Sequence, residues 1–278
     1  MKAYLDLLRQ IMKEGVDRGD RTGVGTRSLF SLQFRHKMSE GFPAVTTKQL
    51  VWKSMVSELL WFISGSNNIY NLKRIYPHNR LWDANYEDYL KRLGISENDG
   101  SMGRTYGIQW RAWRGEGEST VDQLAEAIQT IQTNPDSRRI LVNAWNAAEV
   151  GPQDVALPPC HSFFQFYVSG ENLSLGMYQR SCDMFLGVPL NIASYALLLH
   201  MVAVITNLIP YELVITFGDA HIYQNHFEVV EEQLSRKPYT MPTLWVKIIP
   251  ESIDEFEMDD FELVNYHHHP RLKAMMAV

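Results

Sequence analysis

The sequence predicts a single α+β domain, and three observations lead to that prediction. Helix-like and strand-like runs follow each other without the strict alternation that is typical of a doubly wound sheet. No internal repeat, low-complexity tract or long Pro/Gly/Ser-rich linker divides residues 1–278. Residues 184–210 contain no Asp, Glu, Lys or Arg, which is typical of a helix buried at the centre of one core.

The first half of the chain is expected to be mostly helical. Apolar residues recur at helical spacing within 1–20, 52–64 and 120–133, and an Asn-Pro-Asp turn ends the last of these. Residues 28–35 alternate apolar and polar side chains, which predicts a strand. Residues 86–101 carry charges and an Asn-Asp-Gly turn, so we expect an exposed insertion there.

The second half is expected to supply most of the sheet. Apolar and alternating runs predict strands at 140–145, 163–168, 173–178, 212–217, 243–249 and 261–264. A Ser-Gly-Glu-Asn loop joins the second and third of these as a hairpin. Helices are expected at 191–206, where every side must be buried, and from about His221 to Ser235.

Composition and charge narrow the class of protein. Hydrophobic residues make up 45% and charged residues 21%, which is typical of a globular protein. The 26 Lys and Arg against 32 Asp and Glu give a net charge of −6, and this negative charge argues against non-specific binding of polyanions. Two cysteines, Cys160 and Cys182, cannot form a disulfide framework. Residues 1–20 lack the apolar core of a signal peptide, and Pro189 and His200 interrupt the charge-free segment. We therefore expect a cytoplasmic protein without a membrane span.

Cys160 is the first candidate for catalysis. Pro158 and Pro159 fix the backbone in front of it, and strand-like residues follow. A thiol held in this way could act as a nucleophile if nearby cations lowered its pKa, although a lone cysteine is more often buried and inert. His161 does not decide between the two, since neighbouring strand residues point to opposite faces.

Arginines that could bind a phosphate occur at three places. Arg180 and Ser181 follow a strand and could donate from guanidinium and hydroxyl groups, unless Arg180 forms a surface salt bridge with Asp183. A second site is the doublet at 138–139. Arg21 lies in a glycine-containing loop whose spacing is neither that of a P-loop nor that of a dinucleotide fingerprint. Each of these arginines alone is most often solvated.

Glu58, His221 and Tyr223 are further polar candidates. Glu58 lies within an apolar helical run, so its carboxylate must be either active in proton transfer or structurally paired. His221 and Tyr223 lie on one face if the chain is extended there, whereas Asp219 caps a helix if it is not. The run of histidines at 267–269 cannot converge on one ion, and we predict no metal site.

The following motifs occur in order along the chain: Asp20-Arg21-Thr22-Gly23-x-Gly25-Thr26, Gly41-Phe42-Pro43-x-x-Thr46-Thr47-Lys48, Glu58-Leu59-Leu60-Trp61-Phe62, Asp136-Ser137-Arg138-Arg139, Pro159-Cys160-His161, Tyr178-Gln179-Arg180-Ser181-Cys182-Asp183-x-Phe185-Leu186-Gly187, Pro189-x-Asn191-Ile192-Ala193-Ser194-Tyr195-Ala196 and Gly218-Asp219-x-His221-Ile222-Tyr223. In this order they resemble the folate-dependent thymidylate synthase family. The resemblance runs from residue 20 to the C-terminus. It implies a mixed β-sheet packed by helices and a homodimer formed sheet to sheet.

The activity that the resemblance implies is the reductive methylation of dUMP to dTMP. The co-substrate would be 5,10-methylenetetrahydrofolate, which gives the one-carbon unit and the hydride. Cys160 would attack C6 of the uracil as a thiolate, and Glu58 and Tyr106 would manage the proton transfers.

The resemblance also implies roles for the binding residues. Arg21, Arg180 and Ser181 would hold the phosphate together with Arg138 and Arg139 from the partner subunit, Asn191 would pair with the uracil, and His221 and Tyr223 would bind the 3′-hydroxyl. The full substrate set is Arg21, Arg138, Arg139, His161, Gln179, Arg180, Ser181, Asp183, Asn191, His221 and Tyr223. The folate set is Val51, Trp82, Leu157, Asp183, Leu186, Gly187 and Ala277.

Departures from the family pattern leave a second activity open. Arg104 and Thr105 precede Tyr106 where most members have Pro-Val, and Asn143, Gly176 and Val51 replace the more frequent Ser, Gln and His. A dUMP hydroxymethylase would share the early steps and then add water in place of hydride. Trp82 favours the synthase because it would shelter the intermediate. A non-catalytic nucleic-acid-binding module is disfavoured by the negative charge and by the intact catalytic residues.

Overall fold

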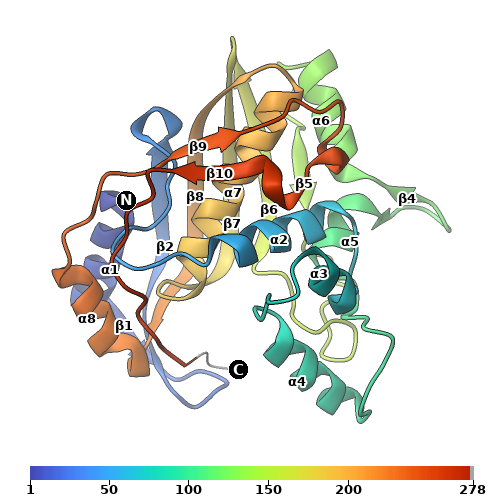
Figure 1. Ribbon diagram of the computed structural model, residues 1–278. Helices are drawn as coiled ribbons and strands as arrows, with labels where there is room; N and C mark the ends of the chain where they lie inside the picture. The colour runs from blue at the N-terminus through green and yellow to red at the C-terminus, as the bar shows by residue number, and fades with distance from the viewer. Residues whose placement is uncertain (276–278) are drawn as a thin grey trace.

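A six-stranded mixed sheet organises the fold in the computed structural model, which describes residues 1–275 (Figure 1). The strand order is β1–β2–β8–β7–β6–β5. Their bounds are Val16–Arg18 for β1, Thr26–Lys37 for β2, Leu141–Asn143 for β5, His161–Ser169 for β6, Asn172–Asp183 for β7 and Ile209–Tyr223 for β8. β7 and β8 are parallel, and every other neighbouring pair in this sheet is antiparallel. The α+β class and the mixed sheet are confirmed.

One face of the sheet is covered by helices. α7 (Gly187–Ile205) packs on β7 and β8, and α2 (Trp52–Ile63) packs on α7 (Figure 1). α1 (Lys2–Glu14) lies against β2 and α8 (Phe227–Ser235). α7 is long and apolar enough to cross a membrane, but most of it is buried between the sheet and α2, which explains why its sequence is apolar on every side.

The remaining elements extend from this core. They are α3 (Ile69–Ile75), α4 (Asp83–Leu93), α5 (Tyr106–Arg111), α6 (Gln123–Thr133), the β3–β4 pair (Trp113–Arg114 and Thr120–Val121) and the β9–β10 pair (Thr243–Val246 and Phe261–Val264). Short 3₁₀ turns cover Met38–Glu40, Gln224–His226, Ile253–Glu255 and Met258–Asp260. α5 packs against both α2 and α6, so its first residue lies close to the core.

The opposite face of the sheet is open. Side chains alternate along β6, so that Phe164 and Phe166 are buried while Phe163 and Tyr167 are 40% and 66% exposed. The exposed aromatic residues continue with Tyr211 at the start of β8. Large aromatic side chains on one open sheet face are typical of a surface that binds another protein.

Two predictions about secondary structure are wrong. The helix expected from His221 begins only at Phe227, because β8 continues to Tyr223. The end of β8 pairs with β2, where Ser28 lies opposite His221. The segment 86–101 is not wholly an exposed insertion. It begins inside α4, whose Tyr89 and Leu90 are buried, and loop structure starts only at Gly94, which ends the helix in the left-handed region with φ of 70°.

Candidate active site

Cys160 and Tyr106 come from distant parts of the chain and meet in the structure. Cys160 directly precedes β6, and its backbone N–H donates to the Tyr106 hydroxyl oxygen at 2.7 Å. Tyr106 is the first residue of α5 and is 3% exposed. The packing of α5 on α2 therefore fixes a phenol beside the thiol-bearing turn.

Arg180 holds the backbone in front of the thiol. Its guanidinium donates to the carbonyl oxygens of Pro159 and Pro158, each at 2.9 Å, rather than to Asp183, and lies 4.8 Å from the ring centroid of Trp145. Burial raises the pKa of the Cys160 thiol, and the Arg180 charge acts most strongly against that rise. The free protein therefore holds a protonated thiol beside a fixed cation.

Glu58 lies beside a cluster of aromatic side chains. The indole N–H of Trp82 donates to Glu58 Oε1 at 2.6 Å. The Trp82 ring packs edge-on against Phe62 and Tyr106, with centroids 6.1 and 6.2 Å apart. Burial raises the pKa of Glu58 to about 7, although the bond from Trp82 acts to lower it. This carboxyl can therefore take up and release a proton near neutral pH.

His161, Gln179 and Asn191 form a group of interacting polar side chains next to Cys160 in the fold. The His161 ring lies between Tyr106 and Tyr195, with centroids 5.0 and 5.2 Å away. Burial lowers the pKa of His161 to about 4, so the ring is neutral and can only hydrogen-bond. Gln179 donates to Asn191 Oδ1 at 3.0 Å, which orients the Asn191 amide.

The ends of β7 and β8 bring the polar candidates together. The parallel register sets Ser181 opposite Asp219 and Asp183 opposite His221. His221 lies edge-on to Tyr223 at 5.2 Å, so the extended form of this segment is correct. The N–H of Gln224 donates to the Gly25 carbonyl, which brings the loop that contains Arg21 beside this strand end.

Asp183 has one oxygen available for a ligand. Its Oδ1 accepts from the backbone N–H groups of Phe185 and Leu186, both at 3.0 Å. Within residues 1–275, the hydrogen bonds to this carboxylate both reach Oδ1, and none reaches Oδ2. Two half-buried leucines pack on the core close by in the sequence: Leu186 follows Asp183, and Leu157 precedes Cys160. An unbonded carboxylate oxygen of this kind, on a chain segment with apolar neighbours, can accept hydrogen bonds from a ligand.

The other predicted folate residues lie at helix starts or beyond the described region. Val51 precedes α2, Trp82 precedes α4, and Gly187 is the first residue of α7. Ala277 lies outside the described residues.

Arg138 and Arg139 are not brought to this site within one chain. Both are exposed and precede β5, where the Gln165 side chain donates to the Arg138 carbonyl. Gln165 lies four residues along β6 from His161, which at the usual strand rise is about 13 Å. The arginine doublet therefore lies beside the edge strand next to β6, but separated from Cys160 along the length of that strand.

Two side chains of the site were missed by sequence reasoning. Trp145 covers the Arg180 guanidinium, and nothing in its local sequence indicates this contact. Lys48 donates to the Phe185 carbonyl and lies 3.6 Å from the Phe185 ring centroid, and burial lowers its pKa to about 7. A lysine between threonines and an apolar run was the available signal for a buried cation.

Two of the three consecutive histidines use their rings in hydrogen bonds to backbone carbonyls. His268 Nδ1 contacts the His269 carbonyl at 2.9 Å, and His269 Nε2 contacts the Lys237 carbonyl at 2.8 Å. Within the described part of the chain, no group of three or more His, Cys, Asp or Glu is arranged to hold a metal ion.

A comparison with protein families identifies a match over nearly the whole sequence. The sequence model described as thymidylate synthase matches residues 2–278, essentially the whole chain, and so includes every residue of the site described above.

Proposed function

Because the chain belongs to the thymidylate synthase family, we propose that it is a methylating member, which converts dUMP to dTMP. Members of this family are methyl or hydroxymethyl transferases that use methylenetetrahydrofolate as co-substrate with a pyrimidine nucleotide such as dUMP. The observation that carries this proposal is the enclosure of Glu58 and Tyr106 by Trp82, beside the thiol of Cys160.

Cys160 supplies the nucleophile in this proposal. Its thiolate adds to C6 of the uracil, which makes C5 able to attack the one-carbon unit. When bound, the reduced folate supplies that unit and, in the synthase reaction, the hydride. The raised pKa of the free thiol means that ionisation must accompany substrate binding, and the Arg180 charge favours the thiolate. The thiolate leaves C6 at the end of the reaction.

Glu58 and Tyr106 move the protons. A carboxyl with a pKa of about 7 is suited to hold and release a proton during one turnover. The Tyr106 hydroxyl accepts from the Cys160 backbone, so its own O–H is free to donate towards the nucleotide or to an ordered water. Trp82 is 5% exposed and covers both groups, which limits the access of water to the reacting carbon.

The nucleotide is bound by polar groups at the ends of β7 and β8, in the loop between β1 and β2, and in the first turns of α7. Arg180, Ser181 and Arg21 are suited to the phosphate, His221 and Tyr223 to the sugar, and the Asn191 amide to the uracil edge, where it can both donate and accept. His161 and Gln179 orient Asn191 from behind.

A homodimer formed through the open sheet face would complete the phosphate site. Phe163 and Tyr167 on this face are exposed, and the helices pack on the other face. Arg138 and Arg139 lie at the edge of the same sheet, with their side chains exposed and far from their own Cys160. Two-fold pairing of such faces can place the doublet of one protomer at the phosphate site of the other.

A dUMP hydroxymethylase is the second candidate, and Thr105 favours it. Its hydroxyl is fully buried next to Tyr106 and has no hydrogen-bond partner within residues 1–275. A buried unpaired hydroxyl commonly bonds an ordered water. Water held there could compete with hydride for the nucleotide.

The test is to identify the products formed from dUMP and methylenetetrahydrofolate. Dihydrofolate with dTMP is the expected result. Tetrahydrofolate with 5-hydroxymethyl-dUMP would replace the proposal by its alternative. Thr105→Val is the matched variant, because it removes the hydroxyl and retains the shape, and it should leave a synthase unchanged but suppress water addition in a hydroxymethylase. If no product forms with either protein, the enzymatic proposal fails.

A further inference from the structure

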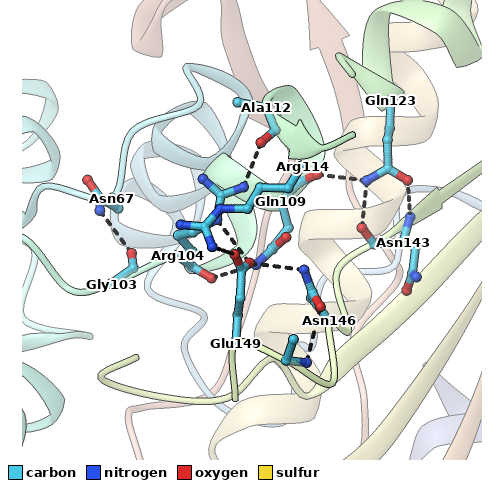
Figure 2. Close-up of polar contacts among 11 residues, drawn as sticks. Asn67, Gly103, Arg104, Gln109, Ala112, Arg114, Gln123, Asn143, Asn146 and Glu149 are labelled. Carbon is cyan, nitrogen blue, oxygen red and sulfur yellow. Dashed lines mark hydrogen bonds and ion pairs between the residues drawn. The ribbon is translucent and has the colours of Figure 1, made fainter. Parts of the chain in front are cut away.

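A buried carboxylate outside the proposed site gathers four polar side chains. Figure 2 shows Glu149, which is 7% exposed, at the centre of this cluster. Its Oε2 accepts from Arg104 Nε at 2.9 Å, Gln109 Nε2 at 2.8 Å and Asn146 Nδ2 at 3.1 Å. The Arg114 guanidinium lies 2.8 Å from Oε1. A charge this deeply buried is stable only when it is paired and hydrogen-bonded in this way.

Arg104 spans both ends of the helix that carries Tyr106. Besides bonding Glu149, its guanidinium donates to the Ala112 carbonyl at 2.6 Å, just after α5 ends. Gln109, in the middle of α5, donates to the Arg104 carbonyl at 3.1 Å as well as to Glu149 (Figure 2). These bonds tie both ends of α5 to one arginine and one carboxylate, in addition to the packing of α5 on α2 and α6. Tyr106, as the first residue of α5, follows any movement of the helix.

Glu149 also holds the segment that covers Arg180. Its backbone N–H donates to the Asn146 carbonyl at 2.9 Å, and its carboxylate accepts from the Asn146 side chain. Trp145 directly precedes Asn146, and its ring lies over the Arg180 guanidinium that bonds the carbonyls in front of Cys160. The same carboxylate is thus connected to the phenol and to the thiol.

We propose that Arg104 and Glu149 form a positioning pair that keeps Tyr106 and the Trp145–Arg180 contact aligned on Cys160. The inference deepens the proposed function and rests on it for its kinetic part. Arg104 is one of the departures from the family pattern, and its side chain points to Glu149 and Ala112 rather than into the proposed site. It therefore acts through Tyr106 and not on the substrate.

The kinetic test compares Arg104→Gln with Arg111→Gln. Arg111 lies on the same helix, and its side chain is about as buried as that of Arg104. It forms ion pairs with the more exposed Asp122 and Asp254, and these contacts do not include Glu149 or Trp145. Arg104→Gln is expected to lower kcat about tenfold and to change the KM for dUMP by less than about twofold, because a small misplacement of a proton-transfer group affects the transition state more than binding. Arg111→Gln should lower stability but retain kcat per folded site.

A second readout needs no substrate. The rate at which iodoacetamide alkylates Cys160 follows its thiolate fraction, whereas Cys182 is fully buried with a raised thiol pKa and should not react in the native protein. Arg104→Gln should move the alkylation profile of Cys160 to higher pH, because Arg180 would be less firmly held beside the thiol. Arg111→Gln should leave the profile in place.

Further variants keep the inference falsifiable. Glu149→Gln should reproduce both effects, and the double variant should be no worse than either single one. Arg104→Lys is the substitute if Arg104→Gln does not fold. It keeps the charge beside Glu149 but loses the contact with the Ala112 carbonyl, so it should fold and lower kcat by less than about tenfold. If the Arg104 variants keep the kcat and the alkylation profile of the wild-type protein, the proposed positioning role is wrong. It is also wrong if Arg111→Gln lowers kcat as much as Arg104→Gln does. If the wild-type protein does not turn over dUMP, the proposed function fails, while the alkylation profiles still decide on the pair.

Discussion

The thiol region, which includes Arg180, differs from the three other arginines assigned to the phosphate in how many hydrogen bonds hold its groups in place. Around Cys160, the backbone N–H, the two preceding carbonyls and the Arg180 guanidinium are all hydrogen-bonded at 2.7 to 2.9 Å. Arg21, Arg138 and Arg139 are exposed, and within residues 1–275 no hydrogen bond or ion pair engages their side chains.

This difference separates two physical tasks. Bond-forming groups must be held within a few tenths of an ångström, so they are built on the core and rigidly bonded. Exposed arginines attract an anion over a longer range and become ordered only when it arrives. The following variants test that division, from the largest expected effect to the smallest.

Cys160→Ser should remove activity by a factor of at least about 10³, because a hydroxyl at the same place is a far weaker nucleophile than a thiolate. The measurement is kcat for dTMP formation, with dUMP binding followed by calorimetry as the control. Binding should persist, since the bonded frame is unchanged. Substantial remaining turnover would show that the prepared thiol is not the nucleophile.

The double change Arg138→Ala with Arg139→Ala should lower kcat/KM for dUMP by about 10²-fold through KM, since charge-assisted bonds to a phosphate are lost. Equal mixing of this variant with Cys160→Ser, after reversible unfolding, tests the shared site. Half of the dimers would be mixed, and each would hold one complete site, so about a quarter of wild-type activity should return. No recovery in a verified mixture would place the doublet outside the partner's site.

Tyr106→Phe should lower kcat about 10- to 100-fold, within the range for loss of one proton-transfer group, with little change in KM. It also removes the acceptor for the Cys160 N–H, so the alkylation rate of the free thiol is a useful second measurement. Unchanged kcat would mean that the ordered phenol serves packing alone.

Glu58→Gln should stabilise the protein at alkaline pH. The folded-state pKa of Glu58 is about 7, above its ordinary 4.5, so the folded protein binds the proton more tightly and loses stability as pH rises between these values. At pH 8 the variant should be more stable by up to about 3 kcal/mol, and near pH 4.5 the two proteins should be equal. Urea unfolding at both pH values checks this. Identical pH dependence in the two proteins would contradict the raised pKa.

The success of sequence reasoning differed between elements for identifiable reasons. α7 was predictable because an unbroken apolar segment has few places to go other than a core. For residues 221–223 the sequence fits both a strand and the start of a helix, and the pairing with β2 that decides between them involves residues almost 200 positions away. α4 was obscured by surface charge, since only Tyr89 and Leu90 mark its buried side.

The candidate site shows the same limit. The sequence by itself determined the residue types, their order and the family, and through them a thiol, a buried carboxyl and several arginines as candidates. Only the tertiary structure decided that Trp82 bonds Glu58, that Trp145 covers Arg180, and that the 138–139 doublet lies far from its own Cys160. The physical reason is that residue type is local information, whereas a distance, a desolvated charge or a shifted pKa depends on which segments the fold packs together.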